Sequence, residues 1–197
     1  AAEMGGEAPK EPLIFLKPTT SLIGDGETIV LPKIAERVDH EGELAIEIGD
    51  VAKNVSEADA LDYVWGFTIA NDVTARDIQD RDGQWTRAKG FDTFCPLGPC
   101  LVTPDEIPDP QQLQVSFRLN GTTMQSAATA TMQFSVADLI AFLAASSTLP
   151  AGSVILTGTP AGVGMAQKPP RWLQPGDVME VEISGIGVLR NEVGEEA

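Results

Sequence analysis

The sequence is poor in the residues that build zinc sites and histidine-based triads. It has one histidine, His40, and two cysteines, Cys95 and Cys100, among 197 residues. A structural zinc site needs four Cys or His ligands, so such a site is excluded. The two cysteines lie in "FCPLGPC", and their spacing differs from that of a redox C-x-x-C pair. We therefore expect two packed, unpaired thiols in a reducing compartment and predict a cytoplasmic protein.

Basic residues are also scarce. The chain has 13 Lys and Arg against 29 Asp and Glu, which gives a formal net charge of −16. It has no spare positive charge to neutralise phosphates, so nucleic acid and anionic membrane surfaces are excluded as partners. The apolar run "LIAFLAASSTL" is too short to span a membrane. The hydrophobic share of 43% is nevertheless that of a folded domain with a core.

What the sequence does contain is a series of short strand patterns and a few helical ones. The alternation in residues 113–119, followed by Asn120-Gly121, predicts a hairpin with a tight primed turn. Apolar residues at helical spacing after Ser135 predict a capped helix up to about residue 146. A shorter helix is predicted at residues 56–64. The remaining strand signals lie at 12–17, 28–32, 39–50 and 65–73, in "SVILTGTPAGVG", and twice in "PGDVMEVEISGIGVLRNEV". The pattern predicts one α+β domain over residues 1–197, dominated by antiparallel strands.

Residues 39–50, "DHEGELAIEIGD", alternate apolar and acidic side chains. In a strand, Glu41, Glu43 and Glu47 share one face. That face is either a solvated surface or part of a cleft that holds a cation, and the stretch alone leaves both open. His40 falls on the opposite, apolar face, where we expect a structural role. One histidine pointing away from the acids gives Ser-His-Asp catalysis little support.

A second acidic position follows the apolar strand predicted at 65–73. Asp72 ends this run, and a carboxylate there is costly to bury unless it is paired or bound to a metal. A helical turn after the strand projects Arg76 and Gln79 from the same side as Asp72. Lys89 follows in "RDGQWTRAKGFDTF". The pattern is typical either of an ordinary Asp–Arg pair beside a solvated basic loop or of a small anionic substrate held beside a metal.

The Gly-rich stretch "LTGTPAGVG" lacks the lysine of a phosphate-binding P-loop and differs from G-x-G-x-x-G. A tight turn is one interpretation. The other is a strand end that presents backbone N–H groups and Thr hydroxyls to a carboxylate.

Together, "FLKPTTSLIGDG", "DHEGELAIEIG", "NDVTARDIQ", "WTRAKGFDTFCPLGP" and "LTGTPAGVG" resemble the small single-domain branch of the fumarylacetoacetate hydrolase family. The resemblance implies a mixed β-roll of that family's type with a few short helices, a homodimer, and Mg²⁺ or Mn²⁺ as cofactor. It also implies that Glu41, Glu43 and Asp72 are the metal ligands, while Glu47 stays structural. Positions that contact a bound 2-keto acid in the family correspond to Arg76, Gln79, Lys89 and Thr159, with Lys17 supporting the same pocket. Three carboxylates without Cys or His suit a hard cation.

One departure concerns the first residues, "AAEM". Family members carry a lid motif resembling H-x-x-E-M, in which His and Glu activate water. Glu3 matches that Glu, and the His falls before Ala1, so we expect a truncated lid region. As written, the chain lacks the histidine of this pair.

The resemblance implies metal-dependent hydrolysis of a C–C bond in an acylpyruvate. Water activated with Glu3 attacks the acyl carbonyl, and the pyruvate enolate leaves, stabilised by the metal and Lys89. Oxaloacetate decarboxylation or tautomerisation, and isomerisation of a hydroxydienedioate, use the same ligands and remain open. The alternative from another class is a non-catalytic acidic β-domain that binds Ca²⁺ or serves as a scaffold.

Overall fold

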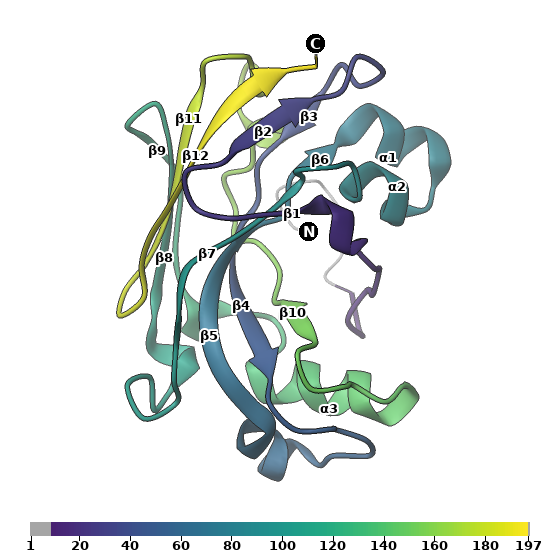
Figure 1. Ribbon diagram of the computed structural model, residues 1–197, viewed down its shortest axis with the longest axis vertical. Helices are drawn as coiled ribbons and strands as arrows, with labels where there is room; N and C mark the ends of the chain where they lie inside the picture. Colours follow the sequence, from purple (N-terminus) through teal and green to yellow (C-terminus); the bar gives the residue numbers. More distant parts are fainter. Residues whose placement is uncertain (1–8, 197) are drawn as a thin grey trace.

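The strands of the protein form two curved five-stranded sheets. The computed structural model describes residues 9–196. Figure 1 shows the two sheets side by side, with α1 and α2 near the start of β4 and α3 near its end. In strand order, the first sheet contains β1 (Leu22–Ile23), β7 (Cys95–Val102), β5 (Val64–Asn71), β4 (Gly42–Ile48) and β10 (Val154–Leu156). The second contains β2 (Thr28–Leu31), β12 (Gly187–Glu195), β11 (Val178–Ile183), β8 (Gln114–Leu119) and β9 (Thr122–Ala128).

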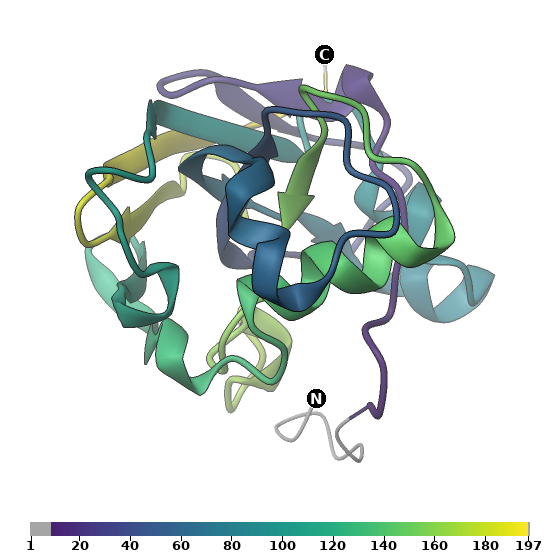
Figure 2. The same ribbon diagram turned by 90° about the horizontal axis from the view of Figure 1, so that it is seen from below.

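Short elements complete the architecture. A small antiparallel pair joins β3 (Val38–Asp39) to β6 (Thr74–Ala75). The α-helices are α1 (Arg76–Asp82), α2 (Trp85–Lys89) and α3 (Val136–Ser146). The 3₁₀-helices are η2 (Thr19–Ser21), η3 (Glu57–Tyr63), η4 (Pro110–Gln112), η5 (Thr129–Thr131) and η6 (Gly164–Ala166). Seen from below, η3 packs beside α3 (Figure 2). The predicted α+β class, with mixed strands and few short helices, is confirmed.

Local sequence signals account for several element boundaries. Asn120 and Gly121 have φ of 51° and 77°, so the predicted primed turn joins β8 to β9. Ser135 begins α3 with a reciprocal capping box in which its hydroxyl accepts from the Asp138 amide. The stretch at 56–64 forms a 3₁₀-helix, η3, in which Ser56 donates to the Asp59 side chain instead of capping the backbone.

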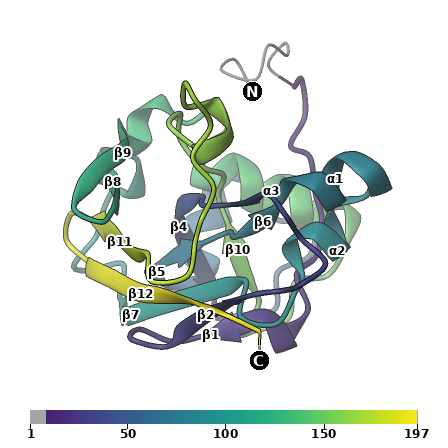
Figure 3. The ribbon, with the colours of Figure 1, turned by 90° about the horizontal axis from the view of Figure 1, so that it is seen from above.

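One face of β4 packs against the second sheet. Gly42, Leu44 and Ile46 share this face, and a Cβ at Gly42 would lie 2.9 Å from Val181 Cγ1 and 3.3 Å from the Phe117 ring. Glycine therefore permits the close approach of the two layers, whose curvature is seen from above in Figure 3. Because side chains alternate along the strand, the acidic residues of this stretch project the opposite way, out of the core.

Two expectations about strands need correction. Residues 12–17 form no strand, because the segment packs on α2 instead, with the Phe15 and Trp85 ring centroids 5.7 Å apart; Leu13, Ile14 and Leu16 are exposed. The stretch at 39–50 is divided between β3 and β4, so Glu41 lies just before the long strand.

None of the helices in residues 9–196 has the length and apolar character of a membrane span.

Candidate metal and substrate site

Three carboxylates meet at one end of the first sheet. Glu41, Glu43 and Asp72 each offer an oxygen, and these oxygens lie within 4.8 Å of one another. Strand register brings them together. In the antiparallel pair of β4 and β5, Gly42 pairs with Asn71, and the Asp72 amide donates to the Glu41 carbonyl over 2.8 Å. All three side chains are buried, with exposed fractions of 8%, 3% and 1%. The acidic face is therefore not a solvated surface.

Lys89 lies between two of these carboxylates. It is the last residue of α2, and its Nζ lies 2.8 Å from Glu41 Oε2 and 2.5 Å from Asp72 Oδ2. It also donates to the Thr74 hydroxyl. Burial alone would lower the pKa of Lys89, but the charges of Glu41 and Asp72 raise it above its ordinary value, so the ammonium stays charged.

A second cation lies behind Asp72. Lys17 Nζ is 2.7 Å from Asp72 Oδ1 and also donates to the Lys89 carbonyl. The segment before Lys17 covers this region, because the Lys89 ammonium lies 5.0 Å from the Phe15 ring and 5.9 Å from the Trp85 ring. The apolar run at 12–17 thus forms part of the wall of the site instead of a strand.

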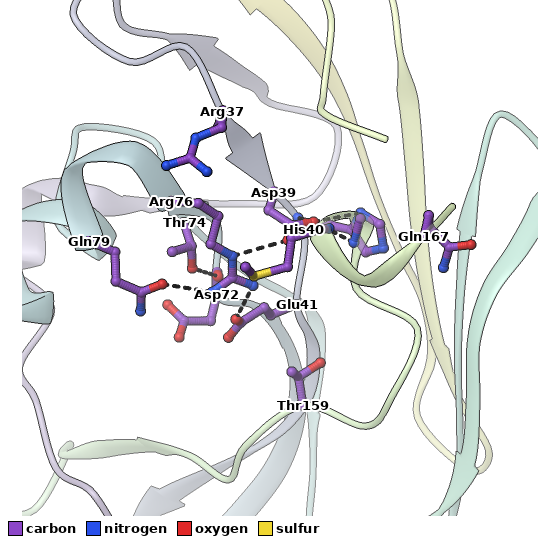
Figure 4. A network of polar contacts seen from close by, with 12 residues as sticks. Arg37, Asp39, His40, Glu41, Asp72, Thr74, Arg76, Gln79, Thr159 and Gln167 are labelled. Carbon is purple, nitrogen blue, oxygen red and sulfur yellow. Dashed lines mark hydrogen bonds and ion pairs between the residues drawn. The ribbon is translucent and has the colours of Figure 1, made fainter. Parts of the chain in front are cut away.

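Arg76 connects three side chains from different elements. As the first residue of α1, it donates through Nε to Asp39 Oδ2 over 3.1 Å, through Nη2 to Glu41 Oε1 over 2.5 Å, and through Nη1 to Gln79 Oε1 over 3.1 Å. Figure 4 shows the guanidinium between Asp39, Glu41 and Gln79. Its position fixes one oxygen of Glu41 and orients the amide of Gln79.

Asp39 is the residue of this network that sequence reasoning missed. Its exposed fraction is 0%, and besides Arg76 it accepts hydrogen bonds from the amides of Gly164 and Met165 over 2.6 and 3.1 Å. A Cβ at Gly164 would lie 2.5 Å from Asp39 Oδ1, so glycine is needed for this approach. The signal was present: Asp39 has the same odd-numbered parity as Glu41 and Glu43, which puts it on their face of an extended chain.

The carboxylates differ in their electrostatic surroundings. Burial would raise the pKa of Glu41, but Lys89 and Arg76 lower it to about 2. Burial raises the pKa of Glu43 well above its usual range, and the charges of Asp72 and Glu41 raise it further. Within residues 9–196, no Lys or Arg forms an ion pair with Glu43. Its Oε2 accepts from the Gly158 amide over 2.7 Å.

This donor set fits a hard divalent cation. Three buried carboxylates, from the start of β4 and the end of β5, converge without any nitrogen or sulfur ligand among the described residues, which matches the oxygen preference of Mg²⁺ and Mn²⁺. Glu43 in particular is a desolvated carboxylate without a paired cation, and metal binding is one of the ways in which such a group is accommodated. Glu41, Glu43 and Asp72 are therefore the residues that can hold a metal here.

The carboxylates form part of the wall of a cavity of about 770 Å³. Arg76, Gln79, Lys89 and Thr159 also line it. Lys17 is not among the described lining residues, and its ammonium reaches the site by donating to Asp72 and to the Lys89 carbonyl. The Gly-rich loop is one wall. Thr159 donates to the Gly42 carbonyl over 3.0 Å and accepts from Gln125 over 2.7 Å. The Gly158 amide of this loop donates to the Glu43 carboxylate, whereas the hydroxyls of Thr157 and Thr159 donate to backbone carbonyls.

The family model described as "Fumarylacetoacetate (FAA) hydrolase C-terminal" matches residues 1–194. The chain belongs to the fumarylacetoacetate hydrolase family. This confirms the resemblance that the motifs indicated.

Relatives and solved structures agree with this fumarylacetoacetate hydrolase assignment. The chain is 48% identical over 192 residues to "Oxaloacetate tautomerase Fahd2a, mitochondrial" of Rattus norvegicus, covering 97% of this chain and 61% of that one. A 5-carboxymethyl-2-hydroxymuconate delta-isomerase from Mycobacterium smegmatis superimposes with a TM-score of 0.89 at 46% identity, over 100% of this chain and 74% of the other. The fumarylacetoacetate hydrolase of Exiguobacterium antarcticum superimposes with a TM-score of 0.90 at 43% identity, over 93% of this chain and 66% of the other.

The other sequence expectations have mixed outcomes. His40 is fully buried and stacks on Phe117 with ring centroids 4.0 Å apart, which agrees with a structural role, and burial lowers its pKa. Glu47 lies outside the carboxylate cluster. Cys95 and Cys100 are both free thiols, but only Cys95 is packed; Cys100 is exposed, so the prediction of two packed thiols is wrong for Cys100. Glu3 lies outside the described residues. The homodimer and the cytoplasmic location remain predictions.

Proposed function

We propose that this protein is a Mg²⁺- or Mn²⁺-dependent enzyme that forms and stabilises the enolate of a small 2-oxo acid. The observation that carries the proposal is the buried cluster of Glu41, Glu43 and Asp72, with Lys89 beside it at the wall of a large cavity. The names of the rat tautomerase and the mycobacterial isomerase support it, since both describe proton shifts without bond cleavage between carbons.

The roles of the residues follow from their contacts. Glu41, Glu43 and Asp72 would hold the cation, which when bound supplies Lewis-acid polarisation of the substrate's carboxylate and 2-oxo oxygens. Enolisation breaks a C3–H bond and moves the electron pair to the 2-oxo oxygen. The three N–H groups of the buried Lys89 donate to Glu41, Asp72 and Thr74, so we assign it stabilisation of the developing negative charge through its positive charge. From the resemblance of "AAEM" to the lid motif of the family, we assign removal of the C3 proton to Glu3.

Arg76 and Gln79 have positioning and binding roles in this scheme. The guanidinium of Arg76 already donates to Asp39, Glu41 and Gln79. We therefore propose that the role of Arg76 is to orient Glu41. The oxygen of Gln79 is taken by Arg76, which leaves its amide NH₂ group as the donor for a substrate carboxylate. Thr159 and Lys17 shape the same pocket through Gly42 and Asp72.

Hydrolysis of an acylpyruvate is the second candidate, because the same enolate is the leaving group. The presence of a fumarylacetoacetate hydrolase among the solved structures favours it. It differs from tautomerisation in needing attack by water on the distal carbonyl.

One assay series tests both candidates. The Mg²⁺-loaded protein is incubated with oxaloacetate, whose enol is followed by ultraviolet absorbance, and with acetylpyruvate, whose products are identified by NMR. We expect accelerated keto–enol conversion that is lost with chelator and in Glu43→Gln. Formation of pyruvate and acetate from acetylpyruvate would show that the protein also catalyses hydrolysis. Activity that survives chelation would overturn the proposal.

A binding test separates an enzyme from an acidic scaffold. Oxalate mimics the planar pyruvate enolate, and a ligand that binds only the folded state raises the melting temperature. We expect oxalate to stabilise the Mg²⁺-loaded protein and not the Glu43→Gln variant. No stabilisation in either would favour the non-catalytic alternative.

A further inference from the structure

The cavity beside the carboxylates extends well beyond the groups that bind a 2-oxo acid head. From its lining we infer that the substrate is a monocarboxylic 2-oxo acid whose far end is an uncharged, apolar chain. This inference rests on the proposed function, because it takes the carboxylate cluster as the place of the 2-oxo acid head. It departs from the oxaloacetate in the name of the rat relative, which carries a second carboxylate.

Charge is confined to one end of the cavity. Among the described residues that line it, the cations are Arg76 and Lys89, and both are paired with the acidic cluster. The other charged lining residues of this part of the chain are Glu41, Glu43 and Asp72 themselves. A second carboxylate at the far end of a ligand would lose its hydration without gaining a cationic partner, which is costly.

The opposite end of the cavity is uncharged in the described part of the chain, and apart from Thr129, Thr131 and Gln133 its lining is apolar. Leu139 and Leu143 are four residues apart on α3 and therefore present one face of that helix. Both line the cavity together with Ile155 of β10, and Met132 and Phe134 lie in the segment before α3. In Figure 1, α3 and β10 lie near the end of β4 that is opposite to α1 and α2.

Strand geometry gives the length of the ligand that would fit. Leu156, which also lines the cavity, pairs with Ala45 on β4, two residues beyond Glu43 and on the same face of the sheet. At about 3.3 Å per residue, the apolar lining begins roughly 7 Å from the acidic end and continues to Leu139 and Leu143 of α3. An extended chain of eight carbons is long enough to reach it. The cavity of about 770 Å³ also falls in the range of roughly 300–1,000 Å³ typical of drug-sized ligands, which are far larger than oxaloacetate.

A matched pair of ligands tests the inference. Binding of pyruvate, 2-oxooctanoate and 2-oxooctanedioate to the Mg²⁺-loaded protein is measured by calorimetry, and NMR follows exchange of their C3 protons in deuterium oxide. Burial of each methylene is worth about a fourfold change in affinity. We expect 2-oxooctanoate to bind at least tenfold more tightly than pyruvate and at least tenfold more tightly than the diacid of equal length.

The outcomes separate the inference from the function on which it rests. If C3 exchange is catalysed but the diacid binds as tightly as the monoacid or better, the inference is wrong and the proposed function stands. Equal affinity for pyruvate and 2-oxooctanoate would also overturn it. If exchange of none of the three is accelerated, the proposed function itself fails.

A substitution on α3 tests the position of the apolar end. Leu143 is half-buried in the cavity wall, and Leu143→Lys places a cation there. We expect the preference for the monoacid over the diacid to fall at least tenfold. Phe142→Lys is the matched control, since Phe142 is the adjacent apolar residue, is exposed and does not line the cavity. An unchanged preference in Leu143→Lys, with folding confirmed by circular dichroism, would contradict the assignment.

Discussion

Asp39 and Arg76 form a buried ion pair, with 3.1 Å between Oδ2 and Nε and side-chain exposed fractions of 0% and 2%. Through Arg76, Asp39 is connected to Glu41, whose Oε1 lies 2.5 Å from Nη2. Through its other contacts it is connected to the amides of Gly164 and Met165. One carboxylate therefore joins the Gly-rich loop to a proposed metal ligand, although it does not itself belong to the acidic cluster.

This relationship predicts a defined effect of Asp39→Asn. Loss of the charge leaves Arg76 only partly compensated, and breaking a buried pair costs about 3–5 kcal/mol of unfolding free energy. Because Glu41 loses its orientation, Mg²⁺ affinity should fall about 10- to 100-fold. Denaturant unfolding and calorimetric titration with Mg²⁺ measure the two effects.

The control for Asp39→Asn is Asp80→Asn. Asp80 pairs with Arg37 over 2.8 Å, but both side chains are exposed, at 61% and 39%, so its loss should cost less than about 1 kcal/mol. Unchanged Mg²⁺ affinity in folded Asp39→Asn would show that Glu41 is positioned without Asp39.

The surroundings of Glu43 predict an unusual pH dependence of the stability of the metal-free protein. Its folded-state pKa is raised by burial and by the neighbouring charges of Asp72 and Glu41. Its contribution to stability is therefore present below its unfolded pKa of about 4.3 and is lost as the pH rises through the raised folded value. Glu41 behaves oppositely: its pKa is lowered to about 2, so its contribution is present at neutral pH and lost in acid.

Glu43→Gln isolates the first of these effects. In chelator, we expect the variant to gain stability relative to the unsubstituted protein as the pH rises above 5, since Gln needs no proton to stay neutral. In Mg²⁺ the order should reverse, because loss of one of three carboxylates weakens cation binding on the order of 100-fold. Thermal unfolding across pH, with and without Mg²⁺, measures both. Parallel pH profiles in chelator would contradict the pKa direction.

Substitution of Lys89 is expected to affect metal affinity and turnover differently. Its ammonium lies 2.8 Å from Glu41 Oε2 and 2.5 Å from Asp72 Oδ2, so it repels a cation placed on these oxygens. Lys89→Met should therefore bind Mg²⁺ at least as tightly as the unsubstituted protein. Turnover should fall about 10²- to 10³-fold, since the positive charge that stabilises the enolate is lost.

Lys53→Met is the control for this substitution. Lys53 is exposed and donates to the Ala145 carbonyl, away from the cluster, so both metal affinity and rate should stay unchanged. If Lys89→Met loses Mg²⁺ binding and keeps its rate at saturating metal, Lys89 holds the ligands in place and has no direct part in catalysis.

Strand parity predicted only part of this site, and the grouping of Asp72 with Glu41 and Glu43 as metal ligands was implied by the resemblance to the family. The alternation around Glu41 and Glu43 predicted that they share one face. The hairpin turn was predicted because Asn120 and Gly121 tolerate the positive φ that a primed turn requires. The segment at 12–17 could not be assigned in the same way, since an apolar run does not show whether a neighbouring edge is available. Asp39 was missed because its role depends on Gly164, which is 125 positions away.

The contact between Asp39 and Gly164 leads to the last prediction. Gly164→Ala would place a Cβ 2.1 Å from the Arg171 carbonyl oxygen and 2.5 Å from Asp39 Oδ1. One of these is backbone, so the loop must move, and overpacking of this kind typically costs about 1–3 kcal/mol. The shift also displaces the amide that holds Asp39. We therefore expect weaker Mg²⁺ binding together with the loss of unfolding free energy.

Gly24→Ala is the matched control, because its new Cβ would meet only the Glu27 carboxylate, at 3.4 Å. It should change the unfolding free energy by less than about 0.5 kcal/mol and leave Mg²⁺ affinity intact. In Gly164→Ala, a loss of stability without any loss of Mg²⁺ affinity would mean that the loop packs against Asp39 without positioning it. A joint loss would show that the loop amides position Glu41 through the contacts of Asp39 and Arg76.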